Sequence, residues 1–396
     1  MQCEVRGSFD NGKLTVYLSG EISSANAPEV QGKLAQLRAD YPAEAIVLDC
    51  DQLRTTSSAG LRVFLRLNQE VENTKIINAH PDLYDVLDMT GFTDMMEVER
   101  AYRVFSVEGC EVIGQGANGI VYRINGDTIV KCYRNPDALP EIKRERELAR
   151  TAFVAGVPTA IPYDVVRIEG GGYGSVFELL NAKSFAKLLI SHEKTVEEVA
   201  DMSVELLKLI HSKTVKPGAL PDMKQIAMEW VNSLENHLPQ EQYEKLVTLV
   251  DNVPQDMHML HGDYHIKNIE LQDGEALLID MDTLCHGHPV FELASMYNAY
   301  AGYGAADHSK IEKFLGISYE TAGAFWKRSL KGYLGTEDPE RIRTVEDKAK
   351  ILGYTRILRR EIRRNGEESE DGRELIDICR KELGELLPRV DTLSFF

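Results

Sequence analysis

The sequence predicts an α/β domain followed by a larger α+β domain built in two lobes. In the first hundred residues, predicted strands alternate with predicted helices, which is typical of a compact α/β layer domain. From about residue 110, a glycine-rich turn leads into a β-hairpin and not into a helix. After residue 295 the sequence shows amphipathic helical patterns. A chain of 396 residues also exceeds what one hydrophobic core usually covers.

The first domain opens with a predicted hairpin around the turn Asp10-Asn11-Gly12. Strands are predicted at 4–8, 14–18, 45–50 and 74–78. Helices are predicted from about 26 to 39, over 61–67 and over 81–89.

A serine-rich turn precedes the predicted helix at 61–67 and reads Thr56-Ser57-Ser58-Ala59-Gly60-Leu61. It resembles the phosphorylation site of STAS domains, the anti-sigma-factor-antagonist fold, where a phosphorylated turn at a helix start switches partner binding. The resemblance makes Ser58 the regulatory phosphorylation candidate and implies a protein partner for this domain. Ser57 stands where that family usually has Asp. Simple N-capping of the helix is the alternative interpretation of the two serines.

The second domain begins with a glycine-rich turn that contains Gly114, Gly116 and Gly119. Glycines let backbone amides approach phosphates without a Cβ clash, and a lysine on a strand neutralises phosphate charge. Lys131 follows at the end of the second hairpin strand. A glycine pattern alone is weak evidence for a nucleotide site, because it also suits dinucleotide-binding folds or a plain hairpin. The hairpin and Lys131 together favour a nucleotide site.

Residues 261–268 (HGDYHIKN) and the later Asp280 carry the strongest chemical signal. Asp263, Asn268 and Asp280 have the order that phosphoryl transfer uses, one carboxylate for the attacking hydroxyl and two groups for Mg²⁺. The apolar run 276–279 predicts a buried strand that ends at Asp280. Asp273-Gly274 predicts a hairpin turn before it.

From about residue 107 onward the chain resembles the aminoglycoside phosphotransferase and choline kinase branch of the protein-kinase-like fold. The resemblance rests on HGDYHIKN, on LIDMD at 278–282 and on PVFELA at 289–294. It implies ATP and Mg²⁺ as cofactors, with Asn268 and Asp280 as metal ligands. Asp263 would orient or deprotonate the acceptor hydroxyl, and Lys131 would contact the α- and β-phosphates.

The resemblance also assigns residues around Lys131. Glu145 is the expected carboxylate partner of Lys131, with Glu147 as the competing choice. Glu178 and Leu180 belong to the segment whose backbone would meet the adenine. A capping box at 195–198 opens the helix that ends near residue 212.

The acceptor is expected to be the hydroxyl of a small molecule. Gly262 precedes Asp263 where protein kinases have an Arg, and few residues separate Asp280 from the helix signal at Pro289. No long activation segment fits there. Two alternatives stay open: a protein Ser/Thr kinase that acts on Ser58 in its own or a neighbouring chain, and a nucleotide-binding scaffold without turnover.

The expected boundaries place a STAS-like regulatory domain at 1–104 and a kinase-like domain at 107–396. Within the second domain, the N-lobe is expected at about 107–180 and the C-lobe at about 181–396. The seam is expected between Arg103 and Gly109.

Composition narrows the classes of partner. A net charge of −18 argues against nucleic acid, because phosphates repel an acidic surface. The sequence has no apolar run long enough to span a membrane and no signal-peptide core at residue 1. Six cysteines without CxxC spacing suit reduced thiols, so a cytoplasmic location is expected.

Three features receive structural interpretations. The histidines at 258, 261, 265, 286 and 288 are expected to make internal hydrogen bonds and not to bind a transition metal. Asp282 is either a second metal ligand or a solvent-facing residue. Arg356, Arg359, Arg360 and Arg363 share one helix face. The alternatives for this face are binding of an anionic substrate or docking of the acidic STAS-like module. The expectation is a solvated face paired with Glu361 and the 367–371 segment.

Overall fold

The computed structural model describes residues 3–10, 12–116 and 118–395. Asn11 and Ala117, which belong to two of the turns expected from the sequence, lie outside the described residues. The chain divides into two compact units: residues 1–108 with 165–173, and residues 109–164 with 174–396.

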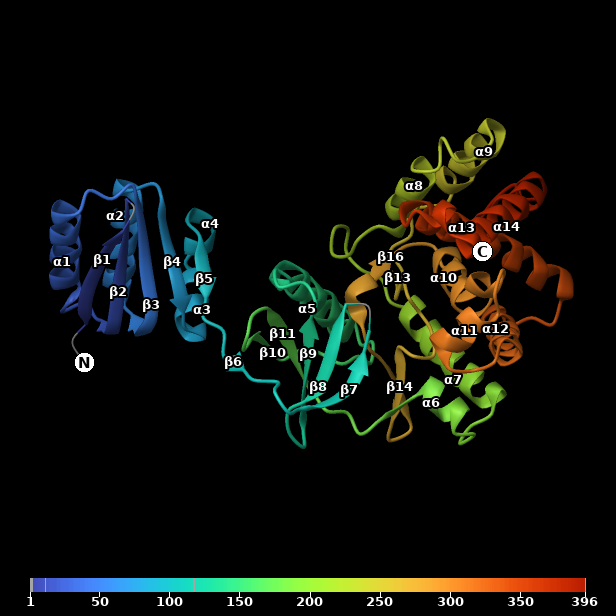
Figure 1. Cartoon of the computed structure of the whole chain (residues 1–396), viewed down its shortest axis with the longest axis horizontal. Helices are drawn as coiled ribbons and strands as arrows, with labels where there is room; N and C mark the ends of the chain where they lie inside the picture. Colours follow the sequence, from blue (N-terminus) through green and yellow to red (C-terminus); the bar gives the residue numbers. More distant parts are fainter. Residues whose placement is uncertain (1–2, 11, 117, 396) are drawn as a thin grey trace. The chain divides into compact units, whose positions relative to one another are not determined.

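The first unit contains a five-stranded sheet in the order β1-β2-β3-β4-β5 (Figure 1). Its strands are β1 (Glu4–Asp10), β2 (Lys13–Ile22), β3 (Ala45–Thr56), β4 (Thr74–Ala79) and β5 (Val98–Arg100). β1 pairs antiparallel with β2, and the following neighbours pair in parallel. Its helices are α1 (Ala27–Asp40), α2 (Ser58–Glu70), α3 (Pro81–Met89) and α4 (Phe92–Met95). The alternation of strands and helices predicted for this region is confirmed.

The core of the first unit lies on one face of the sheet. Along β2, Leu14, Val16 and Leu18 are buried, whereas Tyr17 between them is 47% exposed. Successive strand residues point to opposite faces, so this alternation shows one covered and one open face. β3 extends to Thr56 through polar residues because it pairs in parallel with the second half of β2. A short parallel pairing joins β6 (Val104–Phe105) to β10 (Asp164–Ile168).

The second unit begins with antiparallel strands in the spatial order β11-β9-β8-β7. These are β7 (Glu111–Gln115), β8 (Gly119–Arg123), β9 (Thr128–Tyr133) and β11 (Tyr173–Glu178), with helix α5 (Leu139–Val154) between β9 and β10. The expected hairpin after the glycine-rich turn is therefore present as β7-β8-β9. No helix follows the glycines directly.

The rest of the second unit is mainly helical (Figure 1). Its helices are α6 (Phe185–Ile190), α7 (Val196–His211), α8 (Met223–Asn232), α9 (Gln240–Asp251), α10 (Val290–Tyr300), α11 (Ser309–Leu315), α12 (Tyr319–Leu334), α13 (Pro339–Arg363) and α14 (Glu370–Leu386). Its short strands are β12 (Lys183–Ser184), β13 (Met259–Leu260), β14 (Ile269–Gln272), β15 (Glu275–Leu278) and β16 (Cys285–His286). Short 3₁₀ turns lie at Met281–Thr283, Gly302–Gly304, Gly366–Glu368 and Leu387–Arg389.

Two local predictions in the second unit are confirmed. β14 and β15 form a hairpin whose turn residues Asp273 and Gly274 have φ of 51° and 88°. Positive φ at both central residues is the type I′ turn that suits the twist of a hairpin. Thr195 and Glu198 exchange the two hydrogen bonds of a capping box at the start of α7.

Among the described residues, no helix is long and apolar enough to cross a membrane.

Candidate active site

Lys131 on β9 is held between two carboxylates from distant parts of the chain. Its Nζ lies 2.9 Å from Glu145 Oε1 on α5 and 2.7 Å from Asp280 Oδ1 after β15. The Lys131 side chain is 15% exposed and that of Glu145 8%. Burial opposes the charged amine, but the negative charges of Glu145 and Asp280 raise the pKa of Lys131 well above its ordinary value.

The structure distinguishes the two glutamates left open by the sequence. Glu145 faces Lys131, whereas Glu147 lies on the exposed side of α5, 3.8 Å from Arg150. Glu145 is fixed further by Tyr133, whose hydroxyl donates to Oε2 at 2.5 Å. Sequence reasoning missed Tyr133, although its place two residues after Lys131 puts both side chains on one face of β9.

Asp263 lies in the loop between β13 and β14, with its carboxylate 3.4 Å from His265 Nε2. Burial alone would raise the pKa of Asp263, but the hydrogen bond from His265 and the nearby charge of Arg356 lower it to about 2. The carboxylate is therefore ionised at neutral pH. It is a weak base, and it is suited to orienting a hydroxyl.

Asn268 ties the end of this loop to Ile279, the residue before Asp280. Its Nδ2 donates to the Asp263 carbonyl at 3.1 Å, and its own carbonyl accepts from Ile279 N–H at 3.0 Å. Because the amide nitrogen is engaged, the side-chain oxygen of Asn268 is the atom left to accept or coordinate. The loop and Asp280 are thus brought together by backbone pairing.

The donor set around Asp280 fits Mg²⁺, which is bound in such sites by one or two carboxylates plus substrate phosphates. Asp280 has a left-handed backbone (φ 61°), a conformation that costs energy for a residue other than glycine and concentrates at functional sites. Asp282 does not simply face solvent, since its Oδ2 accepts from Asn118 Nδ2 at 3.0 Å. Burial and the charge of Asp280 raise the pKa of Asp282 to about 7. A bound cation would relieve that repulsion.

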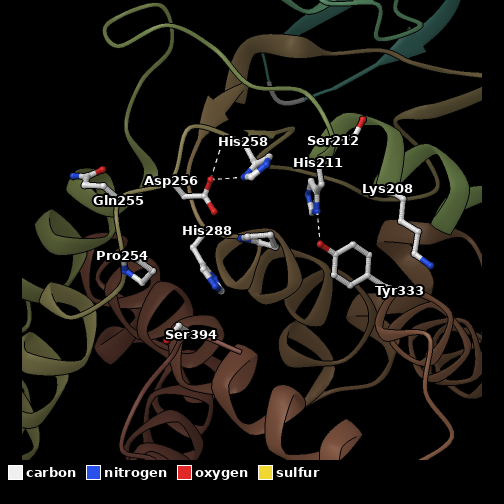
Figure 2. A pocket seen from close by; sticks show the side chains of 11 residues that line it. Lys208, His211, Ser212, Pro254, Gln255, Asp256, His258, His288, Tyr333 and Ser394 are labelled. Atoms are coloured by element: carbon white, nitrogen blue, oxygen red, sulfur yellow. Dashed lines mark hydrogen bonds and ion pairs between the residues drawn. The ribbon is translucent and has the colours of Figure 1, made fainter. Parts of the chain in front are cut away.

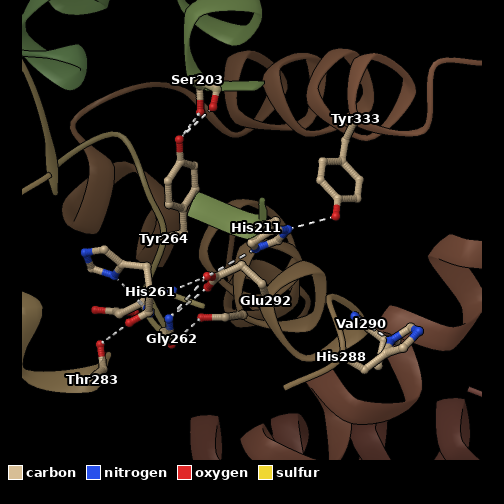
Figure 3. A network of polar contacts seen from close by, with 12 residues as sticks. Ser203, His211, His261, Gly262, Tyr264, Thr283, His288, Val290, Glu292 and Tyr333 are labelled. Carbon is tan, nitrogen blue, oxygen red and sulfur yellow. Dashed lines mark hydrogen bonds and ion pairs between the residues drawn. The ribbon is translucent and has the colours of Figure 1, made fainter. Parts of the chain in front are cut away.

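The loop at residues 261–268, here called the candidate catalytic loop, is held by Glu292 of α10 (Figure 3). This fully buried carboxylate accepts the His261 N–H at 2.5 Å and the Gly262 N–H at 3.0 Å. Gly262 has φ of 82°, and a Cβ there would lie 2.4 Å from the Thr283 carbonyl. Sequence reasoning assigned Glu292 no role, although a lone charge in the otherwise apolar run from Val290 to Ala294 is a detectable signal.

The glycine-rich turn provides open backbone close to this centre. A Cβ on Gly116 would meet nothing within 4 Å, and one on Gly114 would meet only Val121 at 3.6 Å. Gly119 has a packing reason to be glycine, because a Cβ there would lie 2.3 Å from the Cys132 carbonyl. The Gly116 N–H donates to the Gly119 carbonyl at 2.9 Å, which closes the turn.

Glu178 and Leu180 lie where β11 ends. The Leu179 N–H donates to the Asp127 carbonyl at 2.8 Å, which holds this segment to the strand that carries Lys131. Two residues before Glu178, the Val176 carbonyl of β11 accepts a hydrogen bond from the Tyr163 N–H at 3.0 Å.

Comparison with known families identifies both parts of the chain. The model of the phosphotransferase enzyme family (APH) matches residues 109–325, and the STAS domain model matches residues 2–106. The chain belongs to the phosphotransferase enzyme family.

Solved structures that match this chain include a choline/ethanolamine kinase family protein and two aminoglycoside phosphotransferases. A choline/ethanolamine kinase family protein from Mesorhizobium loti is 15% identical, with 70% of this chain and 87% of that chain covered and a TM-score of 0.46. The ADP-bound aminoglycoside phosphotransferase APH(2'')-Ib is 16% identical, with 76% and 96% covered and a TM-score of 0.45. A thermostable mutant of aminoglycoside phosphotransferase APH(4)-Ia is 11% identical, with 71% and 94% covered and a TM-score of 0.47. The comparison with curated proteins found no match.

In the STAS domain, Ser57 and Ser58 have different places at the start of α2. Ser57 is the N-cap, and its Oγ accepts from the Gly60 N–H at 3.4 Å. Ser58 is the first helical residue and is exposed. Capping therefore accounts for Ser57 and leaves the hydroxyl of Ser58 available.

In the phosphotransferase unit, the histidines near the catalytic loop make internal contacts, as predicted. His261 Nδ1 accepts from the Asp263 N–H at 3.3 Å, and its Nε2 lies 3.2 Å from the Ile279 carbonyl. His286 Nδ1 lies 2.8 Å from the Asp256 carbonyl, and His258 Nδ1 2.5 Å from Asp256 Oδ1.

A pocket of about 700 Å³ lies beside His211 (Figure 2). It is lined by Lys208, His211, Asp256, His258, His288 and Tyr333, among others. His211 Nδ1 lies 2.8 Å from the Tyr333 hydroxyl, while its Nε2 lies 3.7 Å from Glu292 Oε2. None of Lys131, Asp263 and Asp280 is among the residues that line this pocket, so it is distinct from the candidate active site.

The expected pairing of the α13 arginines with Glu361 and the 367–371 segment is wrong, although Arg363 is exposed as expected. Arg356 Nη1 lies 3.0 Å from Ser295 Oγ and 3.4 Å from the Gly262 carbonyl, beside the catalytic loop. Glu367 pairs instead with Arg380 at 3.8 Å, and Asp371 with Lys310 at 3.8 Å. The spacing of the arginines predicted that they share one face of the helix, but it could not predict which residues contact that face.

Proposed function

We propose that this protein transfers the γ-phosphoryl group of ATP to a hydroxyl of a small molecule. The observation that carries the proposal is the convergence of Lys131, Glu145 and Asp280 beside the loop that holds Asp263 and Asn268. This arrangement has the parts that phosphoryl transfer uses, which are a phosphate-binding lysine, a hydroxyl-orienting carboxylate and metal-binding oxygens.

Each residue has a distinct part in the proposed reaction. Lys131, fixed by Glu145, would neutralise the nucleotide phosphates, and the backbone at Glu178 and Leu180 would meet the adenine. The turn with Gly114, Gly116 and Gly119 would cover the phosphates. Asn268 and Asp280 would hold Mg²⁺, which when bound neutralises charge on the phosphates.

Asp263 orients the acceptor hydroxyl in line with the bond to be broken. As the new P–O bond forms, the bond from the γ-phosphorus to the ADP oxygen breaks, and the hydroxyl proton passes through Asp263 to solvent. In a loose transition state the attacking hydroxyl needs little deprotonation, so a strong base is not required. This agrees with the low pKa of Asp263. The rate enhancement then comes from positioning and charge neutralisation.

A small acceptor is favoured by the stretch between Asp280 and α10. It contains only a 3₁₀ turn at Met281–Thr283 and the two-residue strand β16. That leaves no long segment on which a peptide would lie. Gly262, which packs against Thr283, stands where protein kinases have the Arg that reads a phosphorylated activation loop.

The exposed hydroxyl of Ser58 supports a second candidate, a protein kinase that acts on Ser58 in the same or another chain. A phosphate there would meet free amides at the start of α2. In this scheme the STAS domain at 1–104 binds a protein partner and regulates the domain at 107–396. The proposed lobes of that domain meet near residue 180.

Incubation with γ-labelled ATP and Mg²⁺ separates these functions. The wild type is compared with Asp263→Asn and Ser58→Ala. We expect nucleotide binding and no label on the protein, with Asp263-dependent transfer to small hydroxyl compounds. Label that both variants lose would establish the Ser58 kinase. Nucleotide binding without transfer to any acceptor would leave a scaffold and contradict the proposal.

A further inference from the structure

Four arginines on α13 form an unpaired cationic surface next to the catalytic loop. They are Arg356, Arg359, Arg360 and Arg363, here called the α13 arginine face, and their spacing of three and four residues places them on one side of the helix. Within the described part of the chain, none of the four forms an ion pair with a carboxylate. The chain has 63 acidic and 45 basic residues, so this lack of partners is unexpected.

Two of these guanidinium groups are held in place by aromatic rings. Arg356 lies 5.4 Å from the ring centroid of Trp230 on α8, and Arg360 lies 4.6 Å from that of Tyr303. Stacking on a ring orients the planar guanidinium and restricts its rotamers. A pre-oriented, unpaired guanidinium loses little entropy when it binds an oxyanion.

Arg359 supplies the clearest sign of a missing partner. Its Nε is buried and has no hydrogen-bond partner among the described residues. Burial and the charges of Arg363 and Arg356 lower the pKa of Arg359, although Glu229 acts in the opposite direction. Leaving a buried donor of a charged group unsatisfied costs free energy, which a bound anion would recover.

The α13 arginine face lies next to the residues proposed to hold the acceptor, so we expect it to contact the acceptor and not ATP. Arg356 contacts the carbonyl of Gly262, the residue before Asp263. Arg359 and Arg360 lie about 5 Å further along the helix axis, since each residue adds about 1.5 Å. A molecule whose hydroxyl meets Asp263 would therefore place a group a few bonds away against these arginines.

We propose that the α13 arginine face binds a phosphate or carboxylate group of the acceptor. The inference rests on the proposed phosphotransferase function and adds the substrate class: a small hydroxyl compound that carries an anion. Cationic hydroxyl compounds are disfavoured at this site, because four unpaired positive charges repel them.

Binding of inorganic phosphate tests the site without knowledge of the acceptor. The full chain is first saturated with ADP and Mg²⁺, so that the nucleotide site is filled, and is then titrated with phosphate. The chain has two tryptophans, and Trp326 is buried and bonded to Glu346, so Trp230 beneath Arg356 acts as the fluorescent reporter. Arg359→Gln/Arg360→Gln is compared with Arg343→Gln, an exposed arginine of the same helix.

We expect saturable phosphate binding to the wild type and to Arg343→Gln, and binding about 10- to 100-fold weaker in the double variant. Equal binding by all three proteins, or none by the wild type, would overturn the inference. Melting temperatures show whether the double variant is folded, and the single variant Arg360→Gln replaces it if it is not.

Acceptor assays then identify which anion is used. ADP formation is measured with matched hydroxyl compounds that carry a phosphate, a carboxylate, no charge or a quaternary amine. Turnover with phosphate or carboxylate compounds supports the inference, and the better of the two classes names the anion. Turnover only with neutral or cationic compounds would overturn it while leaving the proposed function intact. Failure to bind ADP and Mg²⁺ at all would instead contradict the proposed function.

Discussion

Lys131 and the α13 arginine face are both cationic, but within the described residues only Lys131 forms ion pairs with carboxylates. Lys131 is neutralised by Glu145 at 2.9 Å and Asp280 at 2.7 Å. Arg356 and Arg360 lie against aromatic rings, Arg356 also contacts neutral oxygens, and none of the four arginines has an ion-paired carboxylate among the described residues. Internal pairing fixes one geometry before a ligand arrives. Unpaired arginines keep their charge for a ligand that supplies the anion.

Asp263 is the proposed hydroxyl-orienting carboxylate, and its loss should have the largest effect. We expect Asp263→Asn to lower turnover by about 10³-fold, because the hydroxyl loses its orienting carboxylate. Affinity for ATP should change little, since Lys131, Asn268 and Asp280 remain. Steady-state ADP formation and direct nucleotide titration measure the two quantities. Near-normal turnover in this variant would remove Asp263 from its assigned place.

Variants of Glu145 and Glu147 test whether the ion pair with Glu145 positions Lys131. Glu145→Gln removes one of the two carboxylates that fix Lys131, and we expect kcat/KM for ATP to fall about 10- to 100-fold. Glu147→Gln removes the same charge from the exposed side of α5 and should stay within about twofold. A larger effect for Glu147 than for Glu145 would mean that the ion pair of Lys131 differs in solution.

Glu292 tests how far the support of the catalytic loop depends on a buried charge. Glu292→Gln keeps the shape but weakens the bonds to the backbone of His261 and Gly262, so we expect a loss of about 2 kcal/mol in unfolding free energy. Urea unfolding of this variant is compared with Glu374→Gln, an exposed residue of α14. Equal midpoints for both variants would show that the loop does not need this carboxylate.

The pKa of Asp263 predicts a smaller effect of acid. Its folded pKa of about 2 is below the ordinary value of 3.8, so the carboxylate stabilises the fold above pH 4 and this contribution is lost as pH falls toward 2. Between pH 5 and 8 we therefore expect no acid-side loss of activity from Asp263. Melting temperatures of the wild type and Asp263→Asn between pH 2 and 5 should converge at the acid end. A difference that stays constant with pH would contradict the lowered pKa.

The sequence predicted those elements of both domains whose signals are local. The type I′ turn at Asp273-Gly274 and the capping box at Thr195 depend on neighbouring residues, and both are present. The motifs also predicted which residues meet at the candidate site, because the resemblance supplied a known order of strands and loops.

What the sequence could not predict depends on neighbours distant in the chain. The strand β3 extends to Thr56 because of pairing with β2, and Glu292 supports a loop about thirty residues earlier. The surroundings of the α13 arginines were wrongly expected for the same reason. The spacing of the arginines predicted one shared helix face. Only the packing of α13 shows that Trp230, Ser295 and Gly262 lie against Arg356.

Steady-state kinetics with ATP and an anionic acceptor varied independently tests the central claim most directly. The variants are Lys131→Met and Arg359→Gln/Arg360→Gln, one from each side of the comparison. We predict that Lys131→Met lowers kcat and raises KM for ATP, while the arginine variant raises KM for the acceptor by about tenfold or more and leaves KM for ATP unchanged. An arginine variant that instead changes KM for ATP alone would contradict the division of the site into a nucleotide side and an acceptor side.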